Sequence, residues 1–195
     1  MGSPITSCIS SNNNLNYLKL AYTSIRKNAY YKDQPIIVFA ENCTDGTNEW
    51  LQVISKTDLN LTFYTQNNKI PLGIGGGMDF CVSKTKIIEQ SKEERTIASS
   101  FRIQPKIFPN DPDYRPGTVF VPKDEFGEFH HNFDNNYFDK WAIELQSMDE
   151  TRVRKGGGAG FFCRTKDYIW IGGNDPIFAP ASFDDMDLFI RMQLE

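Results

Sequence analysis

The sequence predicts an α/β fold in which a mostly parallel central sheet is flanked by helices. Short apolar runs of strand length alternate with segments of helical periodicity over the first 86 residues, and this alternation is typical of parallel sheets. Turn residues, including Asp45-Gly46 and a glycine-rich stretch, separate the segments. The chain has 195 residues, of which 39% are hydrophobic, so we expect one domain with a sizeable core.

The first half of the chain is predicted to hold three strands, each followed by a helix. The polar cluster 10–14 can cap the first helix. Leu15, Leu18 and Tyr22 then recur at helical spacing, and Pro35 precedes the second apolar run. The expected strands are residues 5–9, 36–39 and 59–64, and the expected helices begin at residue 15, cover 48–55 and cover 78–86.

The second half has weaker periodicity and more proline and aspartate. The glycine run 156–160 opens an apolar segment of strand length, and the last residues have helical spacing. We expect a strand over 95–102, a loop or lid over 104–122, a helix over 133–146, a strand over 161–164 and a helix over 184–194.

Composition excludes several functional classes. A formal net charge of −4 gives no field that would attract a phosphate backbone, so nucleic acid is not an expected partner. The four cysteines lie far apart with no CxxC motif, which argues against a zinc site and against a disulfide scaffold; we expect them to be reduced and partly buried. No stretch approaches the ~20 apolar residues of a membrane span, and the start lacks the features of a signal peptide. We therefore expect a soluble, cytoplasmic protein with no transmembrane segment.

Polar loops follow each of the three predicted strands. The carboxyl ends of parallel strands meet at one edge of a sheet, where ligands of α/β proteins collect. The loops 10–14, 41–47 and 66–77 are therefore expected to share that edge.

The segment after the second strand, "IIVFAENCTDGTNEWL", places Glu41, Asn42 and Asp45 in a strand-to-helix loop. A purely structural Asp-Gly turn explains this pattern equally well. The segment also resembles the signature of family 2 glycosyltransferases, in which an acidic or amide residue after the strand contacts the base of a nucleotide. This resemblance implies that Ser10, Glu41, Asn42 and Asp45 bind a nucleotide.

The stretch "NNKIPLGIGGGMDFCVSKTK" resembles the glycine-rich entry of that family into its third helix, where small residues let the backbone approach the nucleotide. The resemblance implies nucleotide-binding roles for Gly75 and Asp79; the alternative is a flexible loop. The stretch lacks the ending of a phosphate-binding P-loop and the spacing of a dinucleotide fingerprint, so ATPase and dinucleotide functions are discounted.

The end of the chain carries the most specific resemblance. Its residues follow the family order of a small-residue strand, an arginine, a Gly-Gly-x-Asp turn, an acidic pair and an Asp-Leu-x-x-Arg helix. They are 158–160, Arg164, Gly172-Gly173-Asn174-Asp175, Asp184-Asp185, Asp187-Leu188 and Arg191. The resemblance implies that Asp185 is the catalytic base and that Gly172, Gly173 and Asp184 contact the acceptor, since an acceptor hydroxyl must lose its proton as it attacks. Trp170 is interpreted as a core residue, with stacking on a sugar as the alternative.

Together these motifs imply a Rossmann-like GT-A fold in a single domain, residues 1–195, with a nucleotide-binding half (1–86) and an acceptor-binding half (95–195). The implied function is transfer of a sugar from a nucleotide diphosphate donor, of the UDP- or GDP-sugar class, to a hydroxyl of a carbohydrate or glycan acceptor, with inversion. The alternative is a non-catalytic nucleotide- or carbohydrate-binding module of the same fold. A nucleotidyltransferase is weaker, because the glycine-rich loop lacks basic residues.

The chain departs from the family pattern in two places. The family holds a divalent cation, Mg²⁺ or Mn²⁺, with an Asp-x-Asp segment that we expect to be absent here, and relatives continue beyond the final helix. The cation is therefore expected from the resemblance, while its ligands remain unknown. Asp111-Pro112-Asp113 has the spelling of the motif but follows a later strand and sits among prolines.

Overall fold

The computed structural model describes residues 5–85, 98–99, 102–104, 118–122, 125–127, 129–147, 161–179 and 184–194. The chain forms two compact units, and each is described by itself. Unit 1 comprises Met1–Ile97 and Cys163–Glu195, and unit 2 comprises Ala98–Phe162. Residues 163–195, assigned from sequence to the second half of the chain, thus pack with the first 97.

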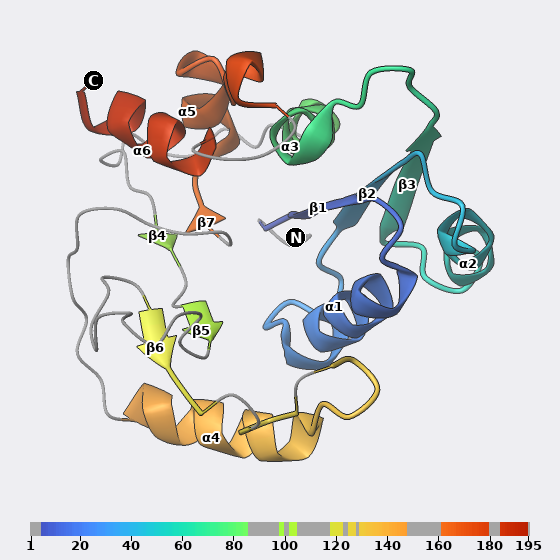
Figure 1. Cartoon of the computed structure of the whole chain (residues 1–195), viewed down its shortest axis with the longest axis vertical. Coiled ribbons are helices and arrows are strands. Elements are labelled where there is room, and N and C mark those ends of the chain that lie inside the picture. The colour runs from blue at the N-terminus through green and yellow to red at the C-terminus, as the bar shows by residue number, and fades with distance from the viewer. Residues whose placement is uncertain are drawn as a thin grey trace. The chain divides into compact units, whose positions relative to one another are not determined.

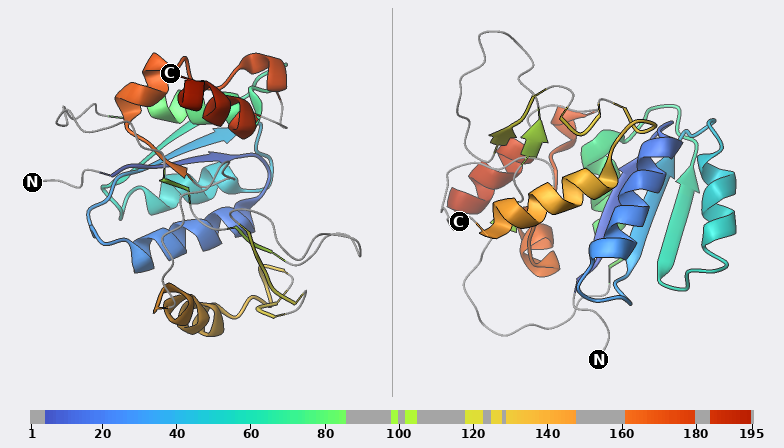
Figure 2. Two further views of the ribbon diagram at one scale, coloured as in Figure 1. Left: turned by 90° about the vertical axis from the view of Figure 1, so that its left-hand side faces the viewer. Right: turned by 90° about the horizontal axis from the view of Figure 1, so that it is seen from below.

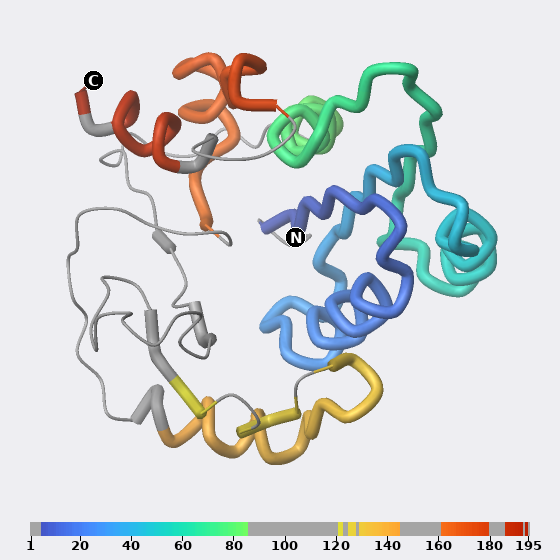
Figure 3. Tube along the Cα trace, in the orientation of Figure 1, coloured from blue at the N-terminus to red at the C-terminus, as the bar shows by residue number. Residues whose placement is uncertain are grey.

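Unit 1 is mixed α/β, with a parallel three-stranded sheet flanked by helices as predicted (Figure 1). Its elements are β1 (Ser7–Ser11), α1 (Leu15–Asn28), β2 (Ile36–Glu41), α2 (Thr47–Ile54), β3 (Leu61–Gln66), α3 (Gly73–Ser83), α5 (Thr165–Trp170), the 3-10 turn Pro176–Phe178 and α6 (Asp184–Leu194). The path of the chain through these elements can be followed in Figure 3.

The strands lie in the order β1-β2-β3, and both pairs are parallel. Ser11 pairs with Ala40 and Glu41 pairs with Gln66, so all three strands end at the same edge. The strands β1 and β3 each lie two residues later than predicted. This edge is the one at which the sequence places the polar loops.

The central strand β2 organises the core because its side chains alternate between the two faces of the sheet. Ile36, Val38 and Ala40 are buried with residues of α1 and α2, including Leu18 and Leu51. Ile37 and Phe39 face the other way and pack with Cys81 of α3. Helix α3 therefore lies on one face of the sheet, and α1 and α2 lie on the other (Figure 2).

Helix α3 begins at Gly73, five residues before the predicted start, so part of the glycine-rich stretch is helical rather than loop. Glycine in a helix interior costs about 1 kcal/mol relative to alanine. The close approach of α3 to β1 offsets this cost, since a Cβ at Gly77 would lie 2.2 Å from Ser10 Oγ. Helix α5 was not predicted; it begins at Thr165, and β7 covers only the first two residues of the strand expected over 161–164.

Unit 2 holds short strands and one long helix. The described elements are β4 (Ala98–Ser99), β5 (Arg102–Gln104), β6 (Thr118–Phe120), α4 (Asn135–Ser147) and β7 (Phe161–Phe162). β4 pairs with β7 antiparallel, and β5 pairs with β6 parallel. Phe126 is the centre of an aromatic cluster, 5% exposed, with rings of Phe133, Tyr137, Phe138 and Trp141 around it. Asp111 and Asp113 lie outside the described residues.

Candidate functional site

Polar side chains tie successive strand-to-helix loops together at the carboxyl edge of the unit 1 sheet. Asn12, after β1, donates from Nδ2 to the carbonyl oxygen of Glu41 at 2.7 Å. Asn13 accepts at Oδ1 from the backbone N–H of Thr44 at 2.7 Å. Its φ of 49° lies in the left-handed region, which asparagine tolerates better than most residues. The loops after β1 and β2 are thus held in one arrangement by the protein itself.

Glu41, the last residue of β2, points toward α3 because it follows Ile37 and Phe39 on the same face. Its side chain is 3% exposed. Oε1 accepts from Asn68 Nδ2 at 2.6 Å and from the N–H of Leu72 at 2.8 Å, and Oε2 accepts from the N–H of Gly73 at 3.2 Å. The carboxylate therefore caps the first turn of α3, whose free N–H groups and dipole favour a negative charge.

Asn42 fastens the loop after β2 to the loop after β3. Its Nδ2 donates to the carbonyl oxygen of Asn68 at 3.1 Å, and its Oδ1 accepts from the N–H of Asn68 at 2.7 Å. These two hydrogen bonds of the Asn42 side chain extend the pairing between β2 and β3 beyond its last pair, Glu41 and Gln66. Asn42 has a φ of 52°, the second left-handed asparagine at this edge among the residues described.

Asp45 joins the starts of α1 and α2. Oδ2 accepts from the N–H of Leu15 at 2.7 Å, and Oδ1 accepts from the Thr47 hydroxyl at 2.6 Å. Burial alone would raise the pKa of Asp45, but the hydrogen bonds from Thr47 and Leu15 outweigh it and hold that pKa below its usual value. Asp45 is therefore a charged cap at both helix starts.

Ser10 lies on β1 and Gly75 lies on α3, so neither belongs to the polar loops at the sheet edge. Ser10, on β1, faces Gly77, and only a glycine fits there because a Cβ would overlap the serine hydroxyl. The carbonyl oxygen of Gly75 accepts from Asn174 Nδ2 at 3.2 Å. Gly75 thus contacts the turn that follows α5.

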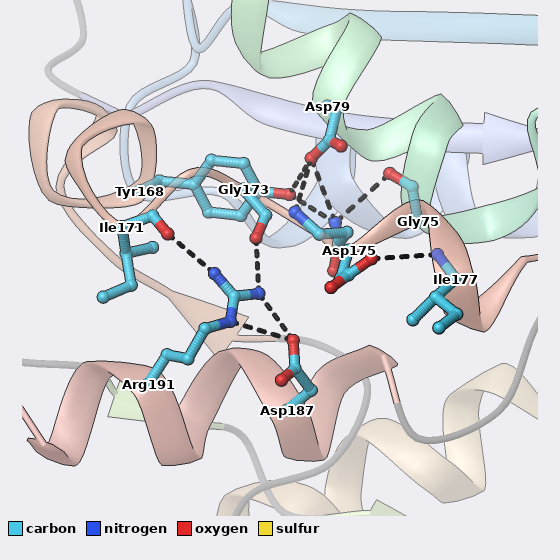
Figure 4. A network of polar contacts seen from close by, with 10 residues as sticks. Gly75, Asp79, Tyr168, Ile171, Gly173, Asp175, Ile177, Asp187 and Arg191 are labelled. Carbon is cyan, nitrogen blue, oxygen red and sulfur yellow. Dashed lines mark hydrogen bonds and ion pairs between the residues drawn. The ribbon is translucent and has the colours of Figure 1, made fainter.

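Asp79, in the middle of α3, is the centre of a polar network that reaches the C-terminal motif (Figure 4). Its Oδ1 accepts from the Tyr168 hydroxyl at 2.6 Å, from the N–H of Asn174 at 3.0 Å and from Asn174 Nδ2 at 3.2 Å. Asn174 Nδ2 also contacts the Tyr168 hydroxyl. Burial, and then the hydrogen bond to Asp79, raise the pKa of Tyr168 well above its usual value, so the phenol stays protonated as a donor.

Arg191 of α6 holds the other side of the same turn (Figure 4). Its two terminal nitrogens donate to the carbonyl oxygens of Ile171 and Gly173, each at 2.7 Å. Asp187, one helical turn earlier, accepts from Arg191 Nε at 2.9 Å and from Nη2 at 2.6 Å. The planar guanidinium therefore joins α6 to the end of α5 and to the glycine turn with four hydrogen bonds.

Gly172 and Gly173 differ although they are neighbours. Both have left-handed backbones, with φ of 92° and 67°. A Cβ at Gly172 would meet nothing within 4 Å, whereas one at Gly173 would lie 2.7 Å from Asp79 Oδ1. Gly172 is exposed, while Gly173 is buried against α3.

Asp184 and Asp185 begin α6, the helix whose last turn carries Arg191. Their side chains lie outside the described residues. Among the residues that the structure describes, no three or more His, Cys, Asp or Glu side chains are grouped so that they could hold a metal ion. The described part of the chain therefore does not supply the divalent-cation site that the resemblance implies.

The structure brings the sequence-predicted residues into two groups. Glu41, Asn42 and Asp45 lie in the loop network at the sheet edge, and Gly75, Asp79 and Gly173 lie in the network around the turn after α5. Helix α3 belongs to both groups: Glu41 caps its first turn, and Asp79 follows about 9 Å further along, at 1.5 Å per residue.

Asn68 and Tyr168 belong to these networks, and neither was predicted as a site residue. Asn68 connects Glu41 with Asn42, and its position two residues after β3 was the available signal. Tyr168 is 3% exposed, whereas Trp170, interpreted from sequence as the core residue, is 54% exposed. Helix α5 turns the Tyr168 side chain toward α3. Because this helix was not predicted, nothing in the sequence favoured Tyr168 over Trp170 as the core residue.

No helix within the described ranges is long and apolar enough to cross a membrane. A scan against protein-family models and a search of curated proteins each gave no match to this chain. The functional conclusion therefore rests on the residues and their geometry.

Proposed function

We propose that this chain is a nucleotide-sugar-dependent glycosyltransferase of the Rossmann-like GT-A type, which transfers a sugar from a UDP- or GDP-sugar to an acceptor hydroxyl with inversion. The parallel sheet of unit 1, with three polar loops at one edge, supports a nucleotide site at that edge.

One observation carries the proposal. The glycine-rich stretch and the C-terminal motif, which the family resemblance names in order, meet in one partly buried network although 95 residues separate Asp79 from Asn174. A chance likeness of isolated short motifs gives no reason for these two segments to touch. Their contact supports a site built from both, with the nucleotide on the side of the sheet loops and the acceptor beside the glycine turn.

Within this proposal Glu41 has a positioning role. A carboxylate has about four lone-pair directions that can accept hydrogen bonds. Three of those of Glu41 are occupied by Asn68, Leu72 and Gly73. Glu41 therefore fixes the loop before α3, and one direction on Oε2 remains for a donor on the base of the nucleotide. Asn42 and Asp45 act in the same way, since their side chains hold the loops whose backbone faces the ligand.

Asp185 is the proposed base that takes the proton of the acceptor hydroxyl, and Asp184 is the alternative. Arg191 and Asp187 fix α6 against the glycine turn and thereby set where the start of that helix lies. The divalent cation that the resemblance implies, Mg²⁺ or Mn²⁺, stays part of the proposal, and the described residues do not identify its ligands.

Calorimetric titration of the full chain with UDP, GDP and the corresponding sugar nucleotides tests the donor site, in EDTA and again in Mn²⁺. Saturable binding of one nucleotide class supports the proposal, and no binding of any of them refutes it. A transfer assay with the bound donor and an array of glycan acceptors then tests turnover.

Asp185→Asn tests the base, because asparagine preserves shape and hydrogen bonding while removing the proton acceptor. We expect a loss of roughly 10²–10⁴-fold in rate with donor binding retained. Asp33→Asn is the matched control, since Asp33 is exposed in the loop before β2 and should leave the rate unchanged. If Asp184→Asn abolishes transfer and Asp185→Asn does not, the base is Asp184.

The second candidate is a non-catalytic module that binds a nucleotide or a carbohydrate. The internal hydrogen bonds of Glu41, Asn42 and Asp45 favour it, because these side chains already serve the fold. Nucleotide or glycan binding without turnover on any acceptor would select this module over the enzyme.

A further inference from the structure

Three cysteines that lie far apart in the sequence come together in unit 1. Cys8 is on β1, Cys81 is on α3, and Cys163 precedes α5; all are free thiols. Cys81 is fully buried, whereas Cys8 and Cys163 are partly exposed. The fourth thiol, Cys43, packs on the opposite face of the sheet with the core that α1 and α2 cover.

The packing of α3 on β1 sets Cys8 opposite Cys81. An ideal Cβ at Gly77 would lie 2.9 Å from the Cβ of Ser10, so the two backbones are unusually close there. Cys81 is four residues, about 6 Å, further along the helix, and Cys8 is two residues, about 6.6 Å, back along the strand. The two elements run in opposite directions, so the two cysteines face each other just as Gly77 and Ser10 do.

Direct contacts agree with this register. Cys8 packs against the cluster of Cys81, Ile37 and Phe39. The Cys81 thiol also lies 3.7 Å from the carbonyl oxygen of Ile9, the residue after Cys8. A disulfide needs a Cβ–Cβ separation of about 3.5–4.5 Å, which a helix this close to a strand can supply.

We propose that Cys8 and Cys81 form a reversible disulfide that links β1 to α3. With oxidised glutathione as the oxidant, a thiolate of the pair attacks one glutathione sulfur, which gives a mixed disulfide and releases one glutathione thiolate. The second cysteine then loses its proton and attacks the protein sulfur of the mixed disulfide, so a second glutathione leaves. The protein loses two protons and two electrons, and the oxidant becomes two glutathione thiols.

The environment of the pair assigns the order of these steps. Cys8 is the partly exposed member and is therefore the sulfur that a soluble oxidant reaches. Cys81 is fully buried and is therefore the second cysteine, which attacks the mixed disulfide at Cys8.

The test is to incubate the reduced full chain with oxidised glutathione, alkylate the remaining thiols and digest with trypsin. Each cysteine falls in its own peptide: residues 1–19, 33–56, 70–84 and 156–164. We expect loss of two of the four thiols and a cross-linked pair of the peptides 1–19 and 70–84, which dithiothreitol separates. Four free thiols after oxidation, or a link from Cys8 to Cys163, would overturn the proposal.

Variants give the matched control. Cys43→Ser removes the thiol on the other face of the sheet and should leave the cross-link unchanged. Cys81→Ser should abolish the cross-link while Cys8 remains open to a glutathione adduct. The peptide map of the wild-type chain tests the cross-link without any variant. The proposal can therefore be refuted even if Cys81→Ser does not fold. The outcome does not depend on glycosyltransferase activity.

Discussion

Replacing Gly173 by alanine is expected to destabilise unit 1 far more than the same change at its neighbour Gly172. Both positions have left-handed backbones, and alanine in that conformation costs about 1–2 kcal/mol. At Gly172 this strain is the whole effect, because the new methyl group would meet nothing within 4 Å. Gly172→Ala is therefore the matched control for backbone strain.

At Gly173 the methyl group would lie 2.7 Å from Asp79 Oδ1 and 3.3 Å from a ring carbon of Tyr168. Asp79 must move away, and its Oδ1 accepts three hydrogen bonds. The loss of one hydrogen bond to a charged acceptor costs about 1.5–3 kcal/mol, so the total for Gly173→Ala is about 2.5–5 kcal/mol with the strain included. The expected difference between the two variants, about 2 kcal/mol, corresponds to roughly a 30-fold change in the unfolding equilibrium constant.

Urea unfolding followed by circular dichroism measures both variants. The argument further predicts that Gly173→Ala in an Asp79→Ala background costs only the backbone strain, because the atom that clashes is gone. Equal destabilisation by Gly172→Ala and Gly173→Ala, or no coupling between positions 79 and 173, would show that the network around Asp79 is not formed as described.

Three further predictions test other contacts. Gly77→Ala would place a methyl group 2.2 Å from Ser10 Oγ and should therefore lower the melting temperature. Adding Ser10→Gly should recover most of that loss. An unchanged melting temperature in Gly77→Ala would contradict the close packing of α3 on β1. Burial alone would raise the pKa of Asp58, but hydrogen bonds, first from Tyr22, hold that pKa below its usual value. Asp58 therefore stabilises the fold above about pH 4, and this contribution is lost as the pH falls through the pKa of the folded state. The urea midpoints of the wild type and Asp58→Asn should therefore converge between pH 6 and pH 3, and parallel curves would refute the assignment. Arg191→Lys keeps the charge but not the planar fork, and it should cost about 1–3 kcal/mol in urea unfolding, with an unchanged midpoint counting against the role of Arg191.

The fold of unit 1 could be predicted because its signals are local. The run 36–40 has five consecutive apolar residues, which is typical of a strand buried on both faces, and all of β2 is buried. The ends of β1 and β3 were harder to place from the sequence. Ser10, Ser11 and Gln66 look like loop residues, yet they continue the ladder because the neighbouring strand β2 supplies their hydrogen bonds.

The glycine-rich stretch was predicted incorrectly for a physical reason. Glycine has a low helix propensity, so a loop up to residue 77 was the natural interpretation. Two long-range contacts override that propensity: Glu41 caps the N–H groups at Leu72 and Gly73, and β1 needs a residue without a side chain at Gly77. The alternation along β2 does place Glu41 on the α3 face, so this cap was open to prediction from the sequence.

The network around Asp79 was beyond reach for a different reason. Its partners Tyr168 and Asn174 are 89 and 95 residues away, and a short helix that the sequence did not reveal turns the tyrosine inward. Periodicity places residues on a face of their own element, but it does not say which distant element covers that face. The likeness in motif order suggested that the two segments belong to one site, and the direct contact came only from the structure.

Helix α3 connects the sheet edge with the C-terminal motif, and this has a consequence for any ligand at that edge. Its first turn is fixed by Glu41, its middle rests on Ser10, and Asp79 holds the turn beside α6. A ligand that needed the loop before α3 to move would have to break three hydrogen bonds to a buried carboxylate. A ligand that fits the loops as they stand loses nothing to ordering them. If the proposed ligand binds at this edge, we therefore expect the loops to keep the arrangement that Glu41, Asn42 and Asp45 give them.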